Sequence, residues 1–190
     1  MKTRTQRTML LPTLLGAFMF TLVALTTLRV AQAADNASAS ATAEVLQPIA
    51  ITKSADLVFG NVVAGNGVVT LATDGTRTKA GATALPTGVA GVAARFDVTG
   101  SGNNTFAIDY TGSSTVLTNG TPADDMAVNW ITEAVGTTTP SGKTDETTDA
   151  TTGTLNAGAA YIYVGGKLTV GGAQTAGTYT GTVQVTVAYN

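Results

Sequence analysis

Apolar and polar residues alternate along most of this chain, in runs of four to eight residues. A β-strand turns successive side chains to opposite faces, so this period of two predicts strands with one apolar face. The clearest run is the last one, where large apolar residues share alternate positions. Because this run is so apolar, we expect it to be an edge strand that pairs with another molecule. Its apolar residues are Tyr179, Val183, Val185, Val187 and Tyr189.

Shorter runs of the same period recur upstream and predict further strands. Turn-forming pairs such as Asn66-Gly67 and Asn119-Gly120 separate them, since glycine and asparagine tolerate the positive φ of tight hairpins. No segment has a sustained helical period, and we expect at most one helical turn, near 122–125. The pattern predicts an all-β, antiparallel sandwich or barrel, with an exposed loop at 136–153. The runs lie at 45–51, 57–59, 69–71, 94–98, 106–110, 116–117, 126–130, 161–163 and 168–170.

The first 33 residues have the order of a secretory signal peptide. Basic residues precede an apolar run at 9–28, and the small residues of Ala31-Gln32-Ala33 form a cleavage site after Ala33. The alternative is a retained membrane anchor, because 20 apolar residues are about the length that a bilayer needs. The threonines and Pro12 within the run favour cleavage. We expect export to the periplasm, then to the cell surface, a fimbrium or the medium, with no membrane span after cleavage.

Cleavage would leave three features to explain: an extension at 34–46, one domain at 47–190, and an acidic charge. Six of the ten basic residues and all twelve acidic ones remain, so the expected mature chain has a net charge of −6. A nucleic-acid-binding protein needs a basic surface, and this composition argues against one. The chain has no cysteine, so the domain must be stable without disulfides, and its length makes that feasible.

The residue types for common catalysis are scarce. The chain has no histidine and no cysteine, which removes the usual general base, the best nucleophile and the best ligands for transition metals. The carboxylate pairs Asp124-Asp125 and Asp145-Glu146 are compatible with glycoside hydrolysis or calcium binding. Charged loop residues that keep strand ends soluble explain them better. We therefore predict no catalytic, cofactor or metal site, and no enzyme activity.

The last strand resembles the final strand of chaperone–usher pilins, the bacterial fimbrial subunits. Gly177 is fourteenth from the end, valines alternate after it, and Tyr189 is penultimate. The resemblance implies an open sandwich whose groove is filled first by a periplasmic chaperone, and then by another subunit's N-terminal extension at an outer-membrane usher. It also implies that the carboxylate of Asn190 meets basic residues of the chaperone. The implied groove and chaperone-recognition residues are Gly177, Tyr179, Val183, Val185, Val187, Tyr189 and Asn190.

A looser resemblance covers nearly all of the expected mature chain. Two stretches, Gln47-Pro-Ile-Ala-Ile-Thr-Lys-Ser-Ala-Asp-Leu-Val-Phe-Gly60 and Leu168-Thr-Val-Gly-Gly-Ala-Gln-Thr-Ala-Gly-Thr-Tyr-Thr-Gly181, are similar to a secreted bacterial family, domain of unknown function 4402. This resemblance implies an immunoglobulin-like sandwich, which in the pilin case lacks its final strand. It implies no activity.

The candidate donor strand is the extension at 34–46, where apolar residues alternate but most are small. Burial of a methyl-sized group contributes about 0.8 kcal/mol and burial of a valine about 1.5–3 kcal/mol, so the whole face yields roughly 5 kcal/mol. Two hypotheses follow. The first is a structural fimbrial subunit assembled with copies of itself or related subunits by donor-strand β-augmentation. The alternative is a self-complete secreted or surface module that binds a glycan or a protein. The donor residues are Ala37, Ala39, Ala41, Ala43 and Val45.

Overall fold

The computed structural model describes residues 35–147 and 149–190, so the expected signal peptide lies outside the described residues. The chain divides into two units between Ala43 and Glu44. In the first unit, residues 35–43 form no regular secondary structure and their side chains are exposed. The second unit, Glu44–Asn190, carries the strands. Within the described ranges, no helix is long and apolar enough to cross a membrane.

The second unit is built from strands, as the alternating pattern predicts. A 3-10 turn, η1, lies where the sequence predicts a helical turn and confirms that prediction. Proline at its start fits, because the first residues of a helical turn need no backbone donor. The elements are β1 Ala50–Ala55, β2 Gly67–Leu71, β3 Arg77–Gly81, β4 Ala94–Thr99, β5 Thr105–Asp109, β6 Val116–Leu117, η1 Pro122–Asp124, β7 Met126–Val135, β8 Thr152–Thr154, β9 Ala159–Val170 and β10 Thr186–Tyr189.

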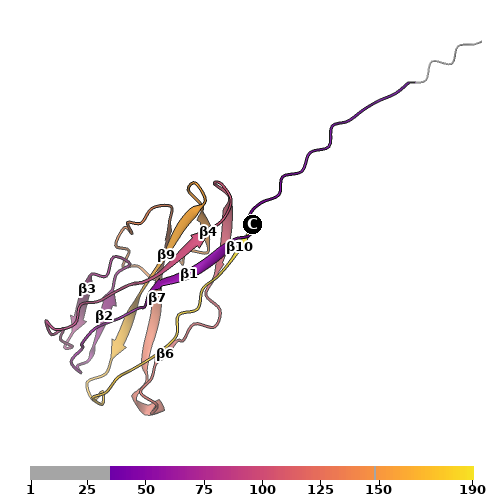
Figure 1. Cartoon of the computed structure of the whole chain (residues 1–190). Helices are drawn as coiled ribbons and strands as arrows, with labels where there is room; N and C mark the ends of the chain where they lie inside the picture. The colour runs from indigo at the N-terminus through magenta and orange to yellow at the C-terminus, as the bar shows by residue number, and fades with distance from the viewer. Residues whose placement is uncertain (1–34, 148) are drawn as a thin grey trace, which may run out of the picture. The chain divides into compact units, whose positions relative to one another are not determined.

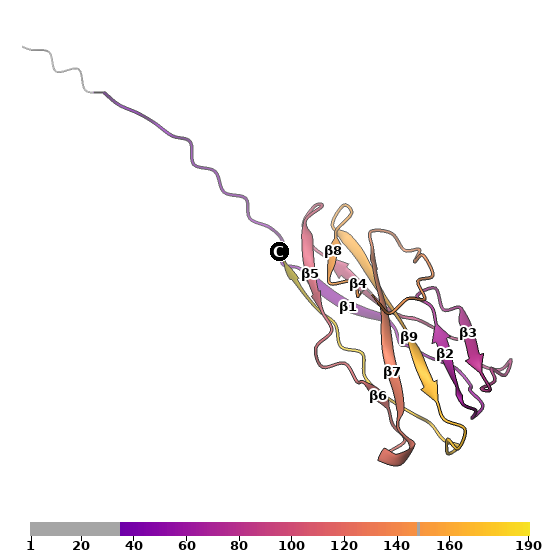
Figure 2. The same cartoon turned by 180° about the vertical axis from the view of Figure 1, so that it is seen from behind.

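The strands form two antiparallel sheets that face each other, so the predicted all-β sandwich is confirmed (Figures 1 and 2). The larger sheet has the order β1-β4-β9-β2-β3, and β7 pairs with β9 and with β6. The smaller sheet has the order β10-β5-β8. Strand β9 organises the larger sheet, because its first half pairs with β4 and its second half with β2.

The core consists of two apolar clusters along β9. We call them the upper cluster, which includes Phe96, Phe106 and Ile162, and the lower cluster, which includes Phe59 and Leu168. Leu57 and Trp130 pack against both clusters. Gly166 lies on β9 between them, and a Cβ there would stand 3.1 Å from the ring of Phe59 and 3.3 Å from that of Trp130. Glycine at this position therefore makes room for two aromatic rings where the clusters meet.

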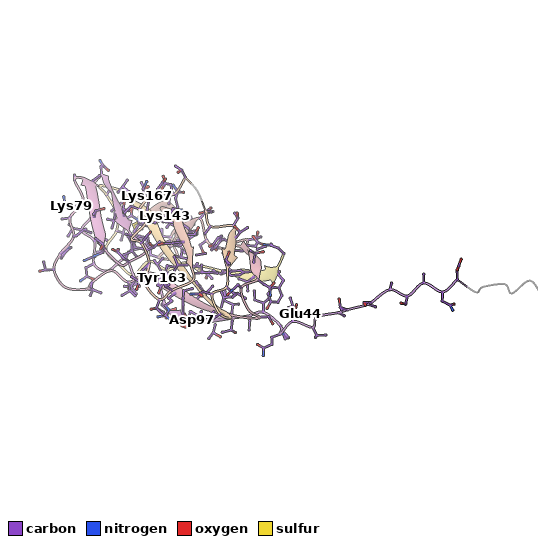
Figure 3. All side chains as sticks on the ribbon, turned by 90° about the horizontal axis from the view of Figure 1, so that it is seen from above. Glu44, Lys79, Asp97, Lys143, Tyr163 and Lys167 are labelled. Atoms are coloured by element: carbon purple, nitrogen blue, oxygen red, sulfur yellow. The ribbon has the colours of Figure 1, made fainter. Side chains whose placement is uncertain are left out.

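The outward-facing residues of β4 and β9 are polar or aromatic. The guanidinium of Arg95 pairs with Asp97 at 2.7 Å and lies 4.8 Å from the ring centre of Tyr161. The hydroxyl of Tyr163 donates a hydrogen bond to the carbonyl of Thr138 at 2.7 Å. Figure 3 labels Asp97 and Tyr163 in the middle of the sandwich, with Glu44 and Lys79 at its opposite ends. Tyr163 is buried at this face, whereas Arg95 and Asp97 remain partly exposed.

Several sequence-predicted segments differ in detail, among them the last run, of which only Thr186–Tyr189 forms a strand. The first strand begins at Ala50 rather than at Val45, whose side chain is 94% exposed. The run at 57–59 is an isolated bridge at Val58 rather than a strand, because the chain turns at Gly60, where φ is +76°. The predicted loop 136–153 includes the start of β8 and is partly buried rather than fully exposed. The loop is anchored to the sandwich, because the N–H of Thr73 donates to the carbonyl of Lys143 and the N–H of Lys143 donates to Thr73 Oγ1.

Candidate strand-binding groove

A long groove of about 1090 Å³ lies between two segments of the second unit. One wall is formed by residues 53–64 and the other by residues 174–183. Each wall extends over ten to twelve residues. The floor belongs to both core clusters, so the groove is apolar at its base. The floor and rim residues are Val89, Ala94, Phe96, Leu117, Met126, Trp130, Leu168 and Val170.

The C-terminal wall is hydrogen-bonded along only one of its two edges. Thr180 exchanges two backbone hydrogen bonds with Thr118, both at 2.9 Å. Further along, Thr182 accepts from the N–H of Ser114 at 2.8 Å, and β10 pairs with β5. In each case the backbone groups of the even-numbered residues point toward β5 and β6. The N–H of Asn190, which donates to the carbonyl of Thr105 on β5, follows the same rule. In Figures 1 and 2 the yellow C-terminal segment runs beside β6 and β5.

The other edge of this wall is open. Successive residues of an extended chain point their N–H and C=O groups to opposite edges, so the odd-numbered residues face the groove. Among the hydrogen bonds of residues 35–147 and 149–190, none involves the backbone of Gly181, Val183 or Val185. Unpaired backbone groups next to an apolar floor are the arrangement that an added strand satisfies.

The opposite wall is likewise bonded on its outer side. Strand β1 pairs with β4, and Val58 exchanges two hydrogen bonds of 2.8 Å with Val92. The guanidinium of Arg77 donates to the carbonyl of Phe59 at 2.8 Å and to that of Asn61 at 3.1 Å. These contacts hold the wall beyond the end of β1, where the chain has no regular strand.

Apolar side chains on both walls stay half-buried. Leu57 on one wall and Val183 on the other pack against the upper cluster but keep part of their surface exposed. Ile51 and Val185, just beyond the lined part, do the same. A strand within a closed sheet would have neighbours on both sides. Partial exposure of these alternating residues is what a missing neighbour leaves behind.

The structure divides the residues that the sequence assigned to the groove into two sets. Gly177, Tyr179 and Val183 line it. Val185, Val187 and Tyr189 lie beyond its lined part and pack against the upper cluster, and Asn190 is exposed. The candidate donor residues Ala37, Ala39, Ala41, Ala43 and Val45 are exposed and form no strand.

Sequence reasoning missed the whole facing wall at 53–64. The alternation of Leu57 and Phe59 was visible, but it is equally compatible with an ordinary core strand. Arg77 was missed as well, because nothing local indicates that its side chain reaches a segment 18 residues away. Only the pairing of distant segments places these residues beside the C-terminal wall.

Two tyrosine hydroxyls make polar contacts along the C-terminal segment. Within the wall, Tyr179 donates to the carbonyl of Thr175 at 2.8 Å and accepts from the side-chain amides of Gln174 and Asn119. Beyond the wall, the hydroxyl of Tyr189 donates to the carbonyl of Gln47 at 2.9 Å. The aromatic rings fill apolar space while their hydroxyls meet polar partners, as is usual for half-buried tyrosine.

Charged groups are sparse in the groove and form no metal cluster. The ion pair between Lys53 and Asp56, at 2.6 Å, stands on the rim with both side chains well exposed. Within the part of the chain that the structure describes, no group of three or more potential metal ligands occurs. The groove is thus suited to an extended peptide with apolar side chains rather than to a charged ligand.

The two carboxylate pairs of the sequence analysis lie in separate polar contacts. Asp124, at the end of η1, accepts a bond from Asn119, and Glu146 pairs with Lys167 at 3.3 Å. Asp145 accepts bonds from the hydroxyl and the N–H of Thr147, and these lower its pKa. A second, smaller hollow of about 370 Å³ adjoins Glu146.

Residues 49–189 match the model of the family described as domain of unknown function (DUF4402). The chain belongs to this family. The match covers both walls and the floor of the groove, so the groove is a feature of the DUF4402 domain of this chain. Comparison with curated proteins and with solved structures found no match to the chain.

Proposed function

We propose that this DUF4402 protein is an exported structural subunit of a surface fibre, assembled by strand addition. In this proposal the groove of one copy receives the extension at 34–46 of a second copy. The periplasmic chaperone and the outer-membrane usher implied by the pilin resemblance act before that exchange. The single observation that supports the proposal best is the apolar groove with unpaired backbone groups along its C-terminal wall.

The dimensions of the extension fit the groove. The walls are ten to twelve residues long, and the apolar alternation of the extension spans nine residues, from Ala37 to Val45. At a rise of about 3.3 Å per residue, the nine residues of the extension reach roughly 30 Å when extended. The extension is thus close in residue number to either wall.

The energetics favour a modest affinity. The apolar face of the donor yields roughly 5 kcal/mol, and backbone hydrogen bonds add about 0.5–1.5 kcal/mol each. Association costs at least about 4 kcal/mol in lost translational and rotational freedom. The backbone bonds therefore decide whether the exchange is stable, and the open edge at Gly181 and Val183 supplies their partners on one wall.

A matched pair of double variants tests the proposal. Ala39→Asp with Ala41→Asp places two charges on the apolar face of the extension, whereas Ser38→Asp with Ser40→Asp places the same charges on its other face. The exported protein is compared by sedimentation and by electron microscopy. Loss of assembly with the alanine pair only is the expected result.

Binding is measured directly with a synthetic peptide of residues 35–46. Trp130 is the single tryptophan of the chain and lines the groove, so its fluorescence reports occupancy. The peptide should change the emission of Trp130 in a saturable way, and a peptide with aspartate at 39 and 41 should not. Equal behaviour of both peptides, or of both double variants, would refute strand addition and leave the self-complete binding module.

A further inference from the structure

The hydroxyl of Tyr189 ties the beginning of the second unit to its end. It donates a hydrogen bond to the carbonyl of Gln47 at 2.9 Å and accepts one from the N–H of Ser101 at 2.7 Å. Ser101 Oγ in turn accepts the N–H of Gln47 at 2.6 Å. We call Tyr189, Gln47 and Ser101 the Tyr189 clamp. Both backbone polar groups of Gln47 are engaged by it.

Two neighbouring residues reinforce the clamp. Pro48 disfavours the helical conformation for Gln47 and holds it extended. Gly100 leaves the space that the phenol occupies, because a Cβ there would collide with the Tyr189 hydroxyl and stand 2.9 Å from Leu155 Cδ1. The direction of the chain at Gln47 is therefore fixed by hydrogen bonds, by Pro48 and by the close packing of the Tyr189 phenol against Gly100.

This direction matters because the extension is tethered to its own groove. The groove wall starts at Lys53, six residues after Gln47, which is about 20 Å of extended chain, whereas residues 35–46 span about 40 Å. Length alone permits the extension to fold back. A short flexible tether gives an effective concentration in the millimolar range, so the chain's own extension would outcompete that of another copy.

We infer that the Tyr189 clamp prevents this self-filling and so keeps the groove available to a second copy. Folding back requires the chain to reverse at 44–48, and a reversal that changes the path at Gln47 has to break the two hydrogen bonds that hold its N–H and C=O groups. Tyr189 is thus a positioning residue: it acts through Gln47 on the path of the extension. The inference rests on the proposed strand addition.

The test uses Tyr189→Phe, which removes only the hydroxyl, with Tyr179→Phe as the control, because Tyr179 has a hydrogen-bonded hydroxyl but makes no bond to Gln47. Each is made in the full mature chain, alone and combined with the Ala39→Asp, Ala41→Asp pair that disables the extension. The readouts are affinity for the 35–46 peptide by Trp130 fluorescence, the monomer fraction by sedimentation, and the fold by circular dichroism.

Self-filling predicts a specific pattern. A tethered competitor at about 1 mM raises the apparent dissociation constant of a peptide that binds at about 100 µM by about tenfold. Tyr189→Phe should show this loss and a larger monomer fraction, and disabling its extension should restore peptide affinity. Tyr179→Phe should show no such restoration. A clamp that only stabilises the fold would also weaken binding, but disabling the extension would not reverse it.

The two proposals fail in different ways. If the peptide binds no variant, including those with a disabled extension, strand addition itself is wrong. If the peptide binds the wild-type chain and Tyr189→Phe equally well, strand addition stands and the inference about the clamp is overturned. The same holds if Tyr189→Phe weakens binding without restoration by the disabled extension.

Discussion

Arg77 offers the sharpest test of how the groove wall is held. Its guanidinium donates to the carbonyls of Phe59 and Asn61 on the wall, and more distantly, at 3.5 Å, to that of Pro86. Arg77→Met keeps most of the aliphatic stem but removes every donor. Carbonyls that the guanidinium satisfied would then lack a partner, and the wall would lose its support beyond β1.

The magnitude follows from the geometry. Hydrogen bonds to a charged group contribute about 1.5–3 kcal/mol each, and the exposure of Asn61 reduces the second one. We expect Arg77→Met to lower the free energy of unfolding by about 2–4 kcal/mol, which is a shift of about 1–2 M in the urea midpoint at a slope near 2 kcal/mol/M. Affinity for the 35–46 peptide should fall as well, measured at low urea where the variant remains folded.

Arg95→Met is the matched control, because Arg95 pairs with Asp97 on the outer sheet face, away from the groove. Partly exposed ion pairs contribute about 0–1 kcal/mol, and the contact with the Tyr161 ring adds about 0.5–1 kcal/mol. Its urea midpoint should fall by about 0.25–1 M, against about 1–2 M for Arg77→Met, with peptide affinity unchanged. Equal shifts in the two variants, or unchanged peptide affinity in Arg77→Met, would refute the role assigned to Arg77.

Three further predictions concern packing and pH. Gly181→Val should destabilise the fold, since a Cβ would stand 2.7 Å from Cδ2 of the buried Leu117 and 3.1 Å from the backbone carbonyl of Val116. Gly177→Val should leave urea stability within about 0.5 kcal/mol, since nothing lies within 4 Å of its Cβ, and similar midpoints would contradict this. Burial raises the pKa of Tyr110 to about 12, so the stability present below pH 10 should decline between pH 10 and 12, by roughly 3 kcal/mol in total. Tyr110→Phe should flatten that decline in alkaline urea titrations. Burial would raise the pKa of Glu133, but hydrogen bonds from Thr73 and other donors lower it below its usual 4.5. The stability that Glu133 contributes is therefore present above that pH and lost on acidification. If Glu133→Gln left the fall of the unfolding free energy with acidification unchanged, this prediction would be wrong.

Much of the strand content was readable from local sequence. The period of two over Met126–Trp130 and Ala94–Val98 predicts strands because alternation itself places one face in the core. The turn at Pro122–Asp124 follows from proline and small polar residues, which favour such turns. The inward face of Val183, Val185 and Val187 was likewise fixed by parity alone. These predictions succeed because they depend on neighbours within a few residues.

The tertiary structure alone decided which edge stays open. Both walls of the groove have ordinary strand patterns, and a pattern does not state whether a strand has one partner or two. That depends on the pairing of Val58 with Val92 and of Thr180 with Thr118, which lie far apart in sequence. The tyrosine pattern near the end of the chain was visible, but the bond from Tyr189 to Gln47 spans 142 positions. Local chemistry sets the face of each strand, whereas the gap between strands results from long-range packing.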